Sequence, residues 1–212
     1  MVVTIIASHF PPNTVAPDLG PKLYNGALSS EMPGFKGTIH LHMDVADAAN
    51  IMMHAERRPT DGGESLAVWD IYRAEDAPKI RDFIRKYFKD ECVLIDDLIH
   101  SQAFYFDYHT RSLLSREFGV VGWCIYQRLG DAIFIPAGCA YQVFNLADCI
   151  NVVCDFVSPE SMDRCLALTR EFREENQKKT WKEEVSQLST MMRFCWLNLR
   201  KTEENMAATD TQ

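Results

Sequence analysis

The sequence predicts a mainly β protein, in which short strands form a small barrel and helices flank it. Two observations favour this fold class. Apolar runs of strand length recur at spacings of about 8–12 residues with turn signals between them, which is typical of barrels and sandwiches. Other segments carry apolar residues at helical spacing, which indicates helices packed against the barrel or against a partner.

The composition is that of an ordinary globular domain. The chain has 212 residues, of which 47% are hydrophobic and 25% charged. No apolar run approaches the roughly 18 residues of a membrane span, and the apolar start lacks the basic residues of a signal peptide. We therefore expect no membrane association. The net charge of −8 disfavours direct contact with a nucleic-acid backbone and is compatible with a basic partner.

Seven cysteines are present, and none form a C-x-x-C pair. Most of them lie in apolar runs. We therefore expect free, buried thiols in a reducing compartment rather than disulfides.

The domain organisation follows from the turn residues and the apolar runs. Residues 1–36 are rich in Pro and Gly and are predicted to form an irregular N-terminal lead-in, with one short strand near Lys22–Asn25. The barrel core is expected over 37–157, with a helical insert over about 76–118. The predicted strands cover 38–45, 49–55, 66–72, 122–129, 131–138, 141–146 and 149–157.

The insert is predicted to contain two helices. Asp76 can cap the first, and Pro78 suits its first turn. The second covers about 110–118 and ends at Gly119, since glycine is the usual residue after a helix.

The C-terminal part, residues 158–204, is predicted to be helical. Ser158 is a candidate N-cap, with Pro159 at the first helical position. We expect residues 205–212 to form a disordered tail.

The pattern that could carry chemistry is His42-Met43-Asp44, an H-x-D motif on a predicted strand. Side chains at i and i+2 of a strand face the same way, so the imidazole and the carboxylate converge on one point inside a barrel. Non-haem Fe(II) oxygenases use such a pair with a second histidine. The motif alone is common, and His40 and Asp47 are neighbouring alternatives.

The second half of such a site would follow the Pro-Gly turn at the end of the strand 131–138. This turn delivers Tyr141 back into the barrel, at the position where a histidine would complete a metal centre. No histidine follows His109, and both His109 and His100 fall in or near the insert, where they are poor substitutes. A phenol binds metal only after losing a proton of pKa about 10, and tyrosinate favours ferric iron over the ferrous ion.

Several stretches together resemble a known family. They are APDLGPKLYNG (16–26), GTIHLHMDVADAANIMMHA (37–55), VWDIYRAEDAPKIRDFI (68–84), LSREFGVVGWCIYQRLGDAIFIPAGCAYQVFNLADCINVVCDFVSPES (114–161) and LTREFR (168–173). The chain resembles JmjC domains, and among these the branch of the histone H3 lysine-nine demethylases and the hairless-type corepressors. The resemblance covers most of residues 16–173.

This resemblance implies a fold, cofactors and a setting. The fold is the double-stranded β-helix, a cupin or jelly-roll barrel. The family cofactors are Fe(II) and 2-oxoglutarate, and the family substrate is methyl-lysine. The histone H3 tail or other chromatin proteins are the implied partners, and the nucleus is the implied location.

The resemblance also assigns roles to individual positions. His42 and Asp44 match the first two metal ligands, and Tyr141 occupies the position of the distal histidine. No catalytic residue beyond the metal ligands is predicted. The matches to the cosubstrate pocket are Thr38, Asn50 and Asn145, and the match to the aromatic residue of the methyl-lysine channel is Tyr24.

Two departures accompany Tyr141. Ile39 stands where the family has a second threonine, so a hydroxyl that could hold a cosubstrate carboxylate is missing. The lysine that often anchors the far carboxylate is not evident. Ala67 stands two residues before Trp69, and the nearest cations, Arg57 and Arg58, belong to a loop.

Two functions remain open from the sequence. The first is a degenerate JmjC domain with weak or no demethylase activity, which serves as a chromatin-associated binding or scaffolding module. The second is an active Fe(II)/2-oxoglutarate dioxygenase with His42, Asp44 and Tyr141 around the metal. A different use of the barrel, such as binding another small acid or another metal, is a third alternative.

Overall fold

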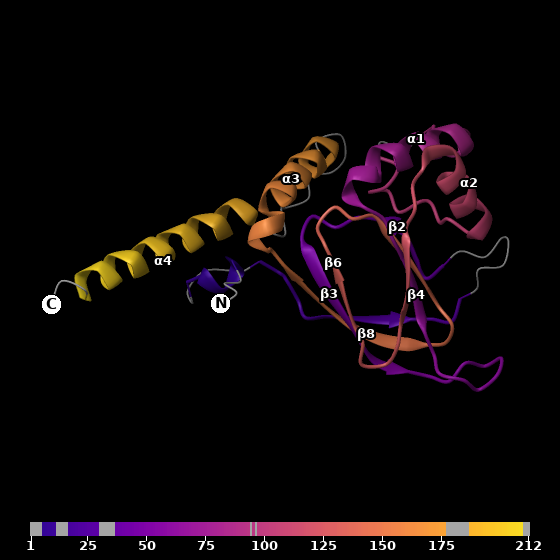
Figure 1. Cartoon of the computed structure of the whole chain (residues 1–212), viewed down its shortest axis with the longest axis horizontal. Helices are drawn as coiled ribbons and strands as arrows, with labels where there is room; N and C mark the ends of the chain where they lie inside the picture. Colours follow the sequence, from indigo (N-terminus) through magenta and orange to yellow (C-terminus); the bar gives the residue numbers. More distant parts are fainter. Residues whose placement is uncertain are drawn as a thin grey trace.

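The computed structural model describes residues 6–11, 17–29, 37–93, 95, 97–176 and 187–209. These residues form two four-stranded antiparallel sheets that face each other as a barrel, with helices at its flanks (Figure 1). The strand orders are β1-β8-β3-β6 and β2-β7-β4-β5. The predicted fold class, a mainly β jelly-roll barrel with flanking helices, is confirmed.

Each predicted strand is present, with ends that differ by a few residues. The first sheet contains β1 (Lys22–Gly26), β8 (Cys149–Phe156), β3 (Asp47–Ala55) and β6 (Ala132–Ile135). The second contains β2 (Ile39–His42), β7 (Tyr141–Asn145), β4 (Ala67–Ile71) and β5 (Trp123–Gln127). The strand predicted over 38–45 ends earlier because its register against β7 shifts between Ile39 and His42. Asp44 therefore follows the strand instead of lying on it.

The two central strands of the second sheet, β7 and β4, are covered on both faces. On the inner face of this sheet, Trp69 of β4 lies opposite Val143 of β7. On its outer face, Gln142 exchanges hydrogen bonds with the backbone of Phe106 at 2.8 and 2.6 Å, because the insert packs there. This explains why β4 and β7 are buried at every position, as is usual for strands between two layers.

The insert carries η2 (Ala74–Asp76), α1 (Ala77–Tyr87) and α2 (Tyr108–Phe118). The side chain of Asp76 does not cap α1, contrary to the prediction. It accepts a hydrogen bond from the Lys79 ammonium at 2.8 Å instead, because a 3₁₀ turn already precedes the helix. The end of α2 agrees with the prediction, since Gly119 follows it in the left-handed conformation with φ 65°.

The C-terminal part contains η3 (Pro159–Ser161), α3 (Met162–Asn176) and α4 (Leu188–Thr209). As predicted, the Ser158 side chain caps the first turn by accepting a hydrogen bond from the Ser161 amide at 3.2 Å. Figure 1 shows α4 running away from the barrel, and it contacts the N-terminal turn η1 (Ile6–His9). Residues 205–209 continue α4 rather than forming a disordered tail, because Met206 and the alanines after it favour helix. Residues 210–212 lie outside the described part.

The cysteine prediction holds in part. As expected, the seven cysteines, all within the described residues, form no disulfide, but Cys124 and Cys154 are exposed. Among the described helices, none combines the length and the apolar character that a bilayer crossing requires.

Candidate metal centre

The two halves of the predicted metal site meet at the ends of two paired strands. His42 ends β2 and lies opposite Tyr141, which begins β7. Their ring centroids are 4.3 Å apart. Asp44 follows β2, and its Oδ2 accepts a hydrogen bond from the Tyr141 hydroxyl at 2.8 Å. The fold thus brings together the three positions that the sequence singled out, and their role as metal ligands stays a prediction.

A backbone contact fixes the distance between the two halves. The Gly138 amide, in the turn before β7, donates a hydrogen bond to the Asp44 carbonyl at 3.0 Å. Gly138 has φ 74°, a left-handed conformation that favours glycine, so the turn can close tightly enough to deliver Tyr141 beside Asp44.

Asp47, one of the alternative ligands in the sequence, has a structural role. One carboxylate oxygen accepts hydrogen bonds from the Ala137 amide and the Ser161 hydroxyl, at 2.8 and 2.7 Å. The other accepts from the amide and the hydroxyl of Ser158, at 2.9 and 2.7 Å. Burial acts to raise the pKa of this carboxyl, but these hydrogen bonds together hold the pKa below its ordinary value. We call Asp47 and these partners the Asp47 lock, because they tie β3 to the turn before Tyr141 and to η3.

His42 is oriented as a metal ligand requires. Its Nδ1 lies 2.8 Å from the His40 carbonyl oxygen. A carbonyl only accepts hydrogen bonds, so Nδ1 carries a proton, and Nε2 is the nitrogen left to bind a metal. The other alternative ligand, His40, points its Nδ1 to the Gln102 carbonyl at 2.9 Å and so contacts the loop between α1 and α2 of the insert.

Tyr141 is a hydrogen-bond donor in this site. Its hydroxyl is buried, and burial raises the pKa of Tyr141 well above its usual value, with a further rise from the charge and the hydrogen bond of Asp44. A neutral phenol is a poor metal ligand. The site therefore offers one imidazole and one carboxylate, and this donor set does not fit a three-ligand Fe(II) centre.

Two of the predicted cosubstrate residues bond to each other. The side-chain NH₂ of Asn145 donates a hydrogen bond to the Thr38 hydroxyl at 3.1 Å, and the Thr38 hydroxyl in turn donates to the Val143 carbonyl at 3.2 Å. Gly26 of β1 packs against the Asn145 side chain so closely that a Cβ atom at this position would overlap it. Thr38 and Asn145 thus lie where β1, β2 and β7 converge.

The third cosubstrate residue, Asn50, belongs to a polar network that the sequence did not reveal. Its side-chain oxygen accepts hydrogen bonds from Asn151 at 2.8 Å and from Gln127 at 3.2 Å. The oxygen of Gln127 accepts from the Trp69 indole at 2.9 Å. All four side chains are buried in the barrel. The sequence signal that could have revealed this network is a polar residue at an inward-facing position of a strand, such as Gln127 on β5.

The predicted cosubstrate residues have no basic side chain as a hydrogen-bond partner within the described part of the chain. Among the described residues, no Lys or Arg hydrogen-bonds to Thr38, Asn50 or Asn145. Ala67 is fully buried, and it lies opposite Asn145 and Gln127. The loop arginines bond within their own loop, Arg57 to the Gly62 carbonyl at 3.4 Å and Arg58 to Asp61 at 3.0 Å. At Thr38, Asn50 and Asn145 a dicarboxylate would therefore meet neutral donors.

Tyr24, the predicted substrate-channel residue, lies on β1 opposite Asn151 and is 48% exposed. It is close enough to Tyr141 to affect the pKa of that residue. Tyr24 thus lies partly exposed on β1 near Tyr141, and its role in binding stays a prediction.

A second group of potential ligands lies between the insert and α3. Asp97, His100 and Glu171 place their ligand atoms within 4.8 Å of one another. Arg81 already engages both carboxylates of this group, since its guanidinium bonds to Asp97 at 2.6 Å and also to Glu171. The group is therefore an ion-pair network that docks α3 on the insert.

The match to a family model establishes the class of protein. Residues 38–156 match the model of the JmjC domain, described as a hydroxylase. This chain belongs to the JmjC domain family, as its sequence motifs and barrel indicated.

Individual relatives narrow the comparison. The chain is 39% identical over 219 residues to Lysine-specific demethylase 3A of Rattus norvegicus, a match that covers 88% of this chain and 18% of the relative. The match to the same demethylase of Homo sapiens is also 39% over 219 residues and covers 88% and 16%. Lysine-specific demethylase 3 of Drosophila melanogaster is 36% identical over 240 residues, with 96% and 28% covered. The chain spans less than a third of the length of each of these relatives.

Proposed function

We propose that this chain is a degenerate JmjC domain of the lysine-demethylase branch, with weak or no demethylase activity, which acts as a binding or scaffolding module on chromatin in the nucleus. The observation that carries the proposal is the hydrogen bond from Tyr141 to Asp44 at 2.8 Å. Tyr141 stands at the position of one metal ligand but acts as a hydrogen-bond donor. Its hydrogen bond engages one carboxylate oxygen of Asp44, the residue at the position of another ligand. While this bond persists, a metal bound by His42 and the other carboxylate oxygen of Asp44 would have no third protein ligand.

The cosubstrate pocket supports the same proposal. A bound 2-oxoglutarate can supply ligands that a two-residue metal site lacks, but its far carboxylate needs a partner. Thr38 and Asn145 bond to each other and Ile39 offers no hydroxyl. We therefore expect both Fe(II) and 2-oxoglutarate to bind weakly, each depending on the other.

The proposed ligand is a lysine-bearing tail such as that of histone H3. The relatives are named lysine-specific demethylases, and Tyr24 is half-exposed on β1 near Tyr141. The net charge of −8 favours approach of a basic peptide. Binding of such a tail requires no intact metal centre.

One observation favours the alternative, an active dioxygenase. His42, Asp44 and the Tyr141 hydroxyl lie together, so a cation that displaces the phenol proton would find three ligands. Bound metal lowers the pKa of the groups that it binds. In that case the chain would consume 2-oxoglutarate and demethylate lysine.

A turnover assay separates the two functions. Wild type, Tyr141→His and His42→Ala are incubated with Fe(II), 2-oxoglutarate and a histone H3 peptide methylated at lysine nine, and succinate and formaldehyde are measured. We expect wild type to be indistinguishable from His42→Ala. Turnover by wild type that His42→Ala abolishes would contradict the proposal. Binding of the same peptide should persist in His42→Ala and weaken in Tyr24→Ala.

A further inference from the structure

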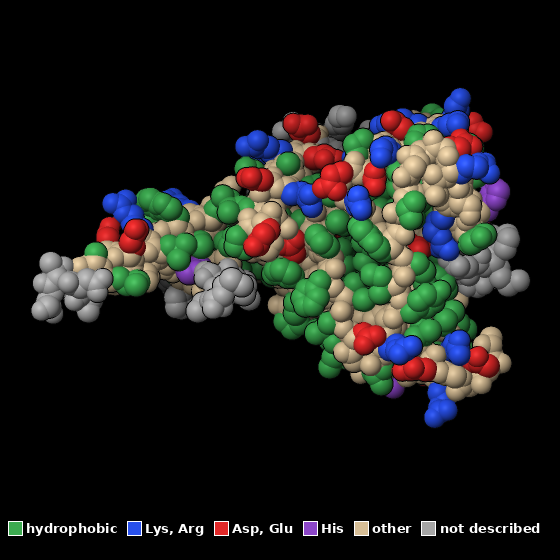
Figure 2. Space-filling view, viewed as in Figure 1, with side chains coloured by type: hydrophobic (Ala, Val, Ile, Leu, Met, Phe, Trp, Pro, Cys, Tyr) green, Lys and Arg blue, Asp and Glu red, His purple; other side chains and the backbone are tan. Residues whose placement is uncertain are grey.

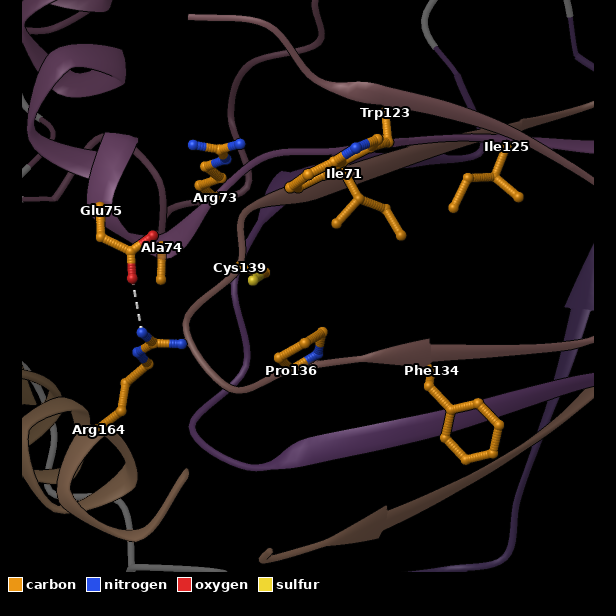
Figure 3. Close-up of a pocket in the computed structure, with 10 residues that line it drawn as sticks. All are labelled: Ile71, Arg73, Ala74, Glu75, Trp123, Ile125, Phe134, Pro136, Cys139 and Arg164. Carbon is orange, nitrogen blue, oxygen red and sulfur yellow. Dashed lines mark hydrogen bonds and ion pairs between the residues drawn. The ribbon is translucent and has the colours of Figure 1, made fainter. Parts of the chain in front are cut away.

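A groove with a volume of about 460 Å³ opens between the two sheets, at the seam where β5 meets β6. Figure 3 shows Trp123 and Ile125 of β5 along one side, and Phe134 and Pro136 on the other. Each of β5 and β6 is the last strand of its sheet. The groove therefore runs between two strand edges.

The groove is separate from the surface around Tyr24. The sheet orders leave two seams, one between β1 and β2 and the other between β5 and β6. Tyr24 lies on β1, at the first seam. The groove lies at the second. A ligand in the groove would not occupy the proposed substrate channel.

The walls of the groove are apolar and exposed. Phe134 is 67% exposed and Trp123 is 49% exposed. In Figure 2, hydrophobic side chains gather over the strands on this face of the molecule. Contiguous apolar surface of this kind is typical of interaction sites rather than of free surface.

One end of the groove is positively charged. The Arg73 guanidinium lies over the Trp123 ring, 5.5 Å from its centroid, and Arg73 forms no ion pair among the described residues. Arg164 bonds to Glu75 at 2.7 Å (Figure 3). Two arginines against one glutamate leave one positive charge at this end, on a chain whose net charge is −8.

We propose that this groove binds an extended peptide of a partner protein, which places a bulky apolar side chain between Trp123 and Phe134 and a carboxylate against Arg73. The two strand edges suit an extended chain, since such edges are where peptides add to sheets. The unpaired guanidinium selects an acidic residue next to the apolar one. The ligand thus has the opposite charge from a histone tail, and its binding does not depend on the state of the metal centre.

Selection from a random peptide library displayed on phage, with the whole chain as bait, tests this proposal. The expected product is a set of sequences that share a large apolar residue with Asp or Glu close by. A labelled synthetic peptide of the selected sequence is then titrated by fluorescence polarisation. Phe134→Ser and Arg73→Glu should each weaken binding roughly tenfold or more.

Matched variants control for changes of surface character. Tyr108→Ser removes an exposed aromatic side chain on α2, and Arg170→Glu reverses an exposed charge on α3. Both should bind the peptide as wild type does. The proposal is overturned if no sequence is enriched, if the selected peptides bind Phe134→Ser unchanged, or if they carry Lys or Arg in place of the acid. A dimer in sedimentation that Phe134→Ser dissociates would also overturn it, since the groove would then hold a second copy.

Discussion

Asp44 and Asp47 belong to one short segment, yet their surroundings differ. Asp47 is 3% exposed, and three residues donate hydrogen bonds to it. Asp44 is half-buried, and among the described residues its carboxylate receives a side-chain hydrogen bond from Tyr141 alone. The lock that positions the site is complete, whereas the proposed ligand set beside it offers only one imidazole and one carboxylate. The comparison teaches that the proposed loss of a metal centre concerns a few side chains, while the hydrogen bonds that hold the surrounding backbone are present.

The largest expected effect concerns the lock. Asp47→Ala should lower the free energy of unfolding by about 3 kcal/mol or more, because it leaves the buried donors of Ala137, Ser158 and Ser161 without an acceptor. Urea unfolding followed by tryptophan fluorescence measures this change. Asp90→Ala, at an exposed loop position, should change the stability by less than about 0.5 kcal/mol. Equal changes in the free energy of unfolding for the two substitutions would show that the hydrogen bonds of the Asp47 lock do not stabilise the fold.

The stabilisation by Asp47 should depend on pH. The hydrogen bonds outweigh burial and hold the pKa of Asp47 below its ordinary value of 3.8. Asp47 therefore contributes its full stabilisation above that value and loses it as the pH falls through the pKa of the folded state. The stability difference between wild type and Asp47→Asn should be constant near neutral pH and shrink below about pH 4. A difference that grows on acidification contradicts this account.

A smaller effect is expected at the ligand set. Tyr141→Phe removes one hydrogen bond to a carboxylate, and Asp44 loses a partner that water can replace. We expect a loss of about 1 kcal/mol in the free energy of unfolding. Tyr108→Phe, on the surface of α2, serves as the matched control and should have no measurable effect. If Tyr141→Phe is as stable as wild type, the bond between Tyr141 and Asp44 contributes nothing.

The strands and the site positions could be predicted because their signals are local. Each strand has an inner face, so its apolar pattern is visible in a few consecutive residues, and the Pro-Gly turn indicated where Tyr141 enters the barrel. The Asp47 lock was missed because its donors lie about a hundred residues further along the chain. Gln127 and Asn151 were missed for the same reason, since each meets Asn50 only after the sheets close.

Whether Tyr141 is a phenolate or a neutral phenol could also not be predicted from the sequence. A tyrosine in place of a ligand is compatible with either a phenolate on a metal or a neutral donor. The choice depends on burial and on the distance to Asp44, both of which the fold sets. The prediction that Asp76 caps α1 was wrong for a comparable reason, because the 3₁₀ turn before α1 is not evident from residue types.

The central claim is that Tyr141 is a donor to Asp44 and not a metal ligand, and calorimetric titration tests it most directly. Ni(II) or Mn(II), redox-inert stand-ins for Fe(II), is titrated into wild type, Tyr141→Phe and Tyr141→His, with and without 2-oxoglutarate. We predict that wild type binds the metal no more tightly than Tyr141→Phe, and that Tyr141→His binds at least about tenfold more tightly than both. Tight binding by wild type that Tyr141→Phe abolishes would contradict the account, because the tyrosine would then be the third ligand.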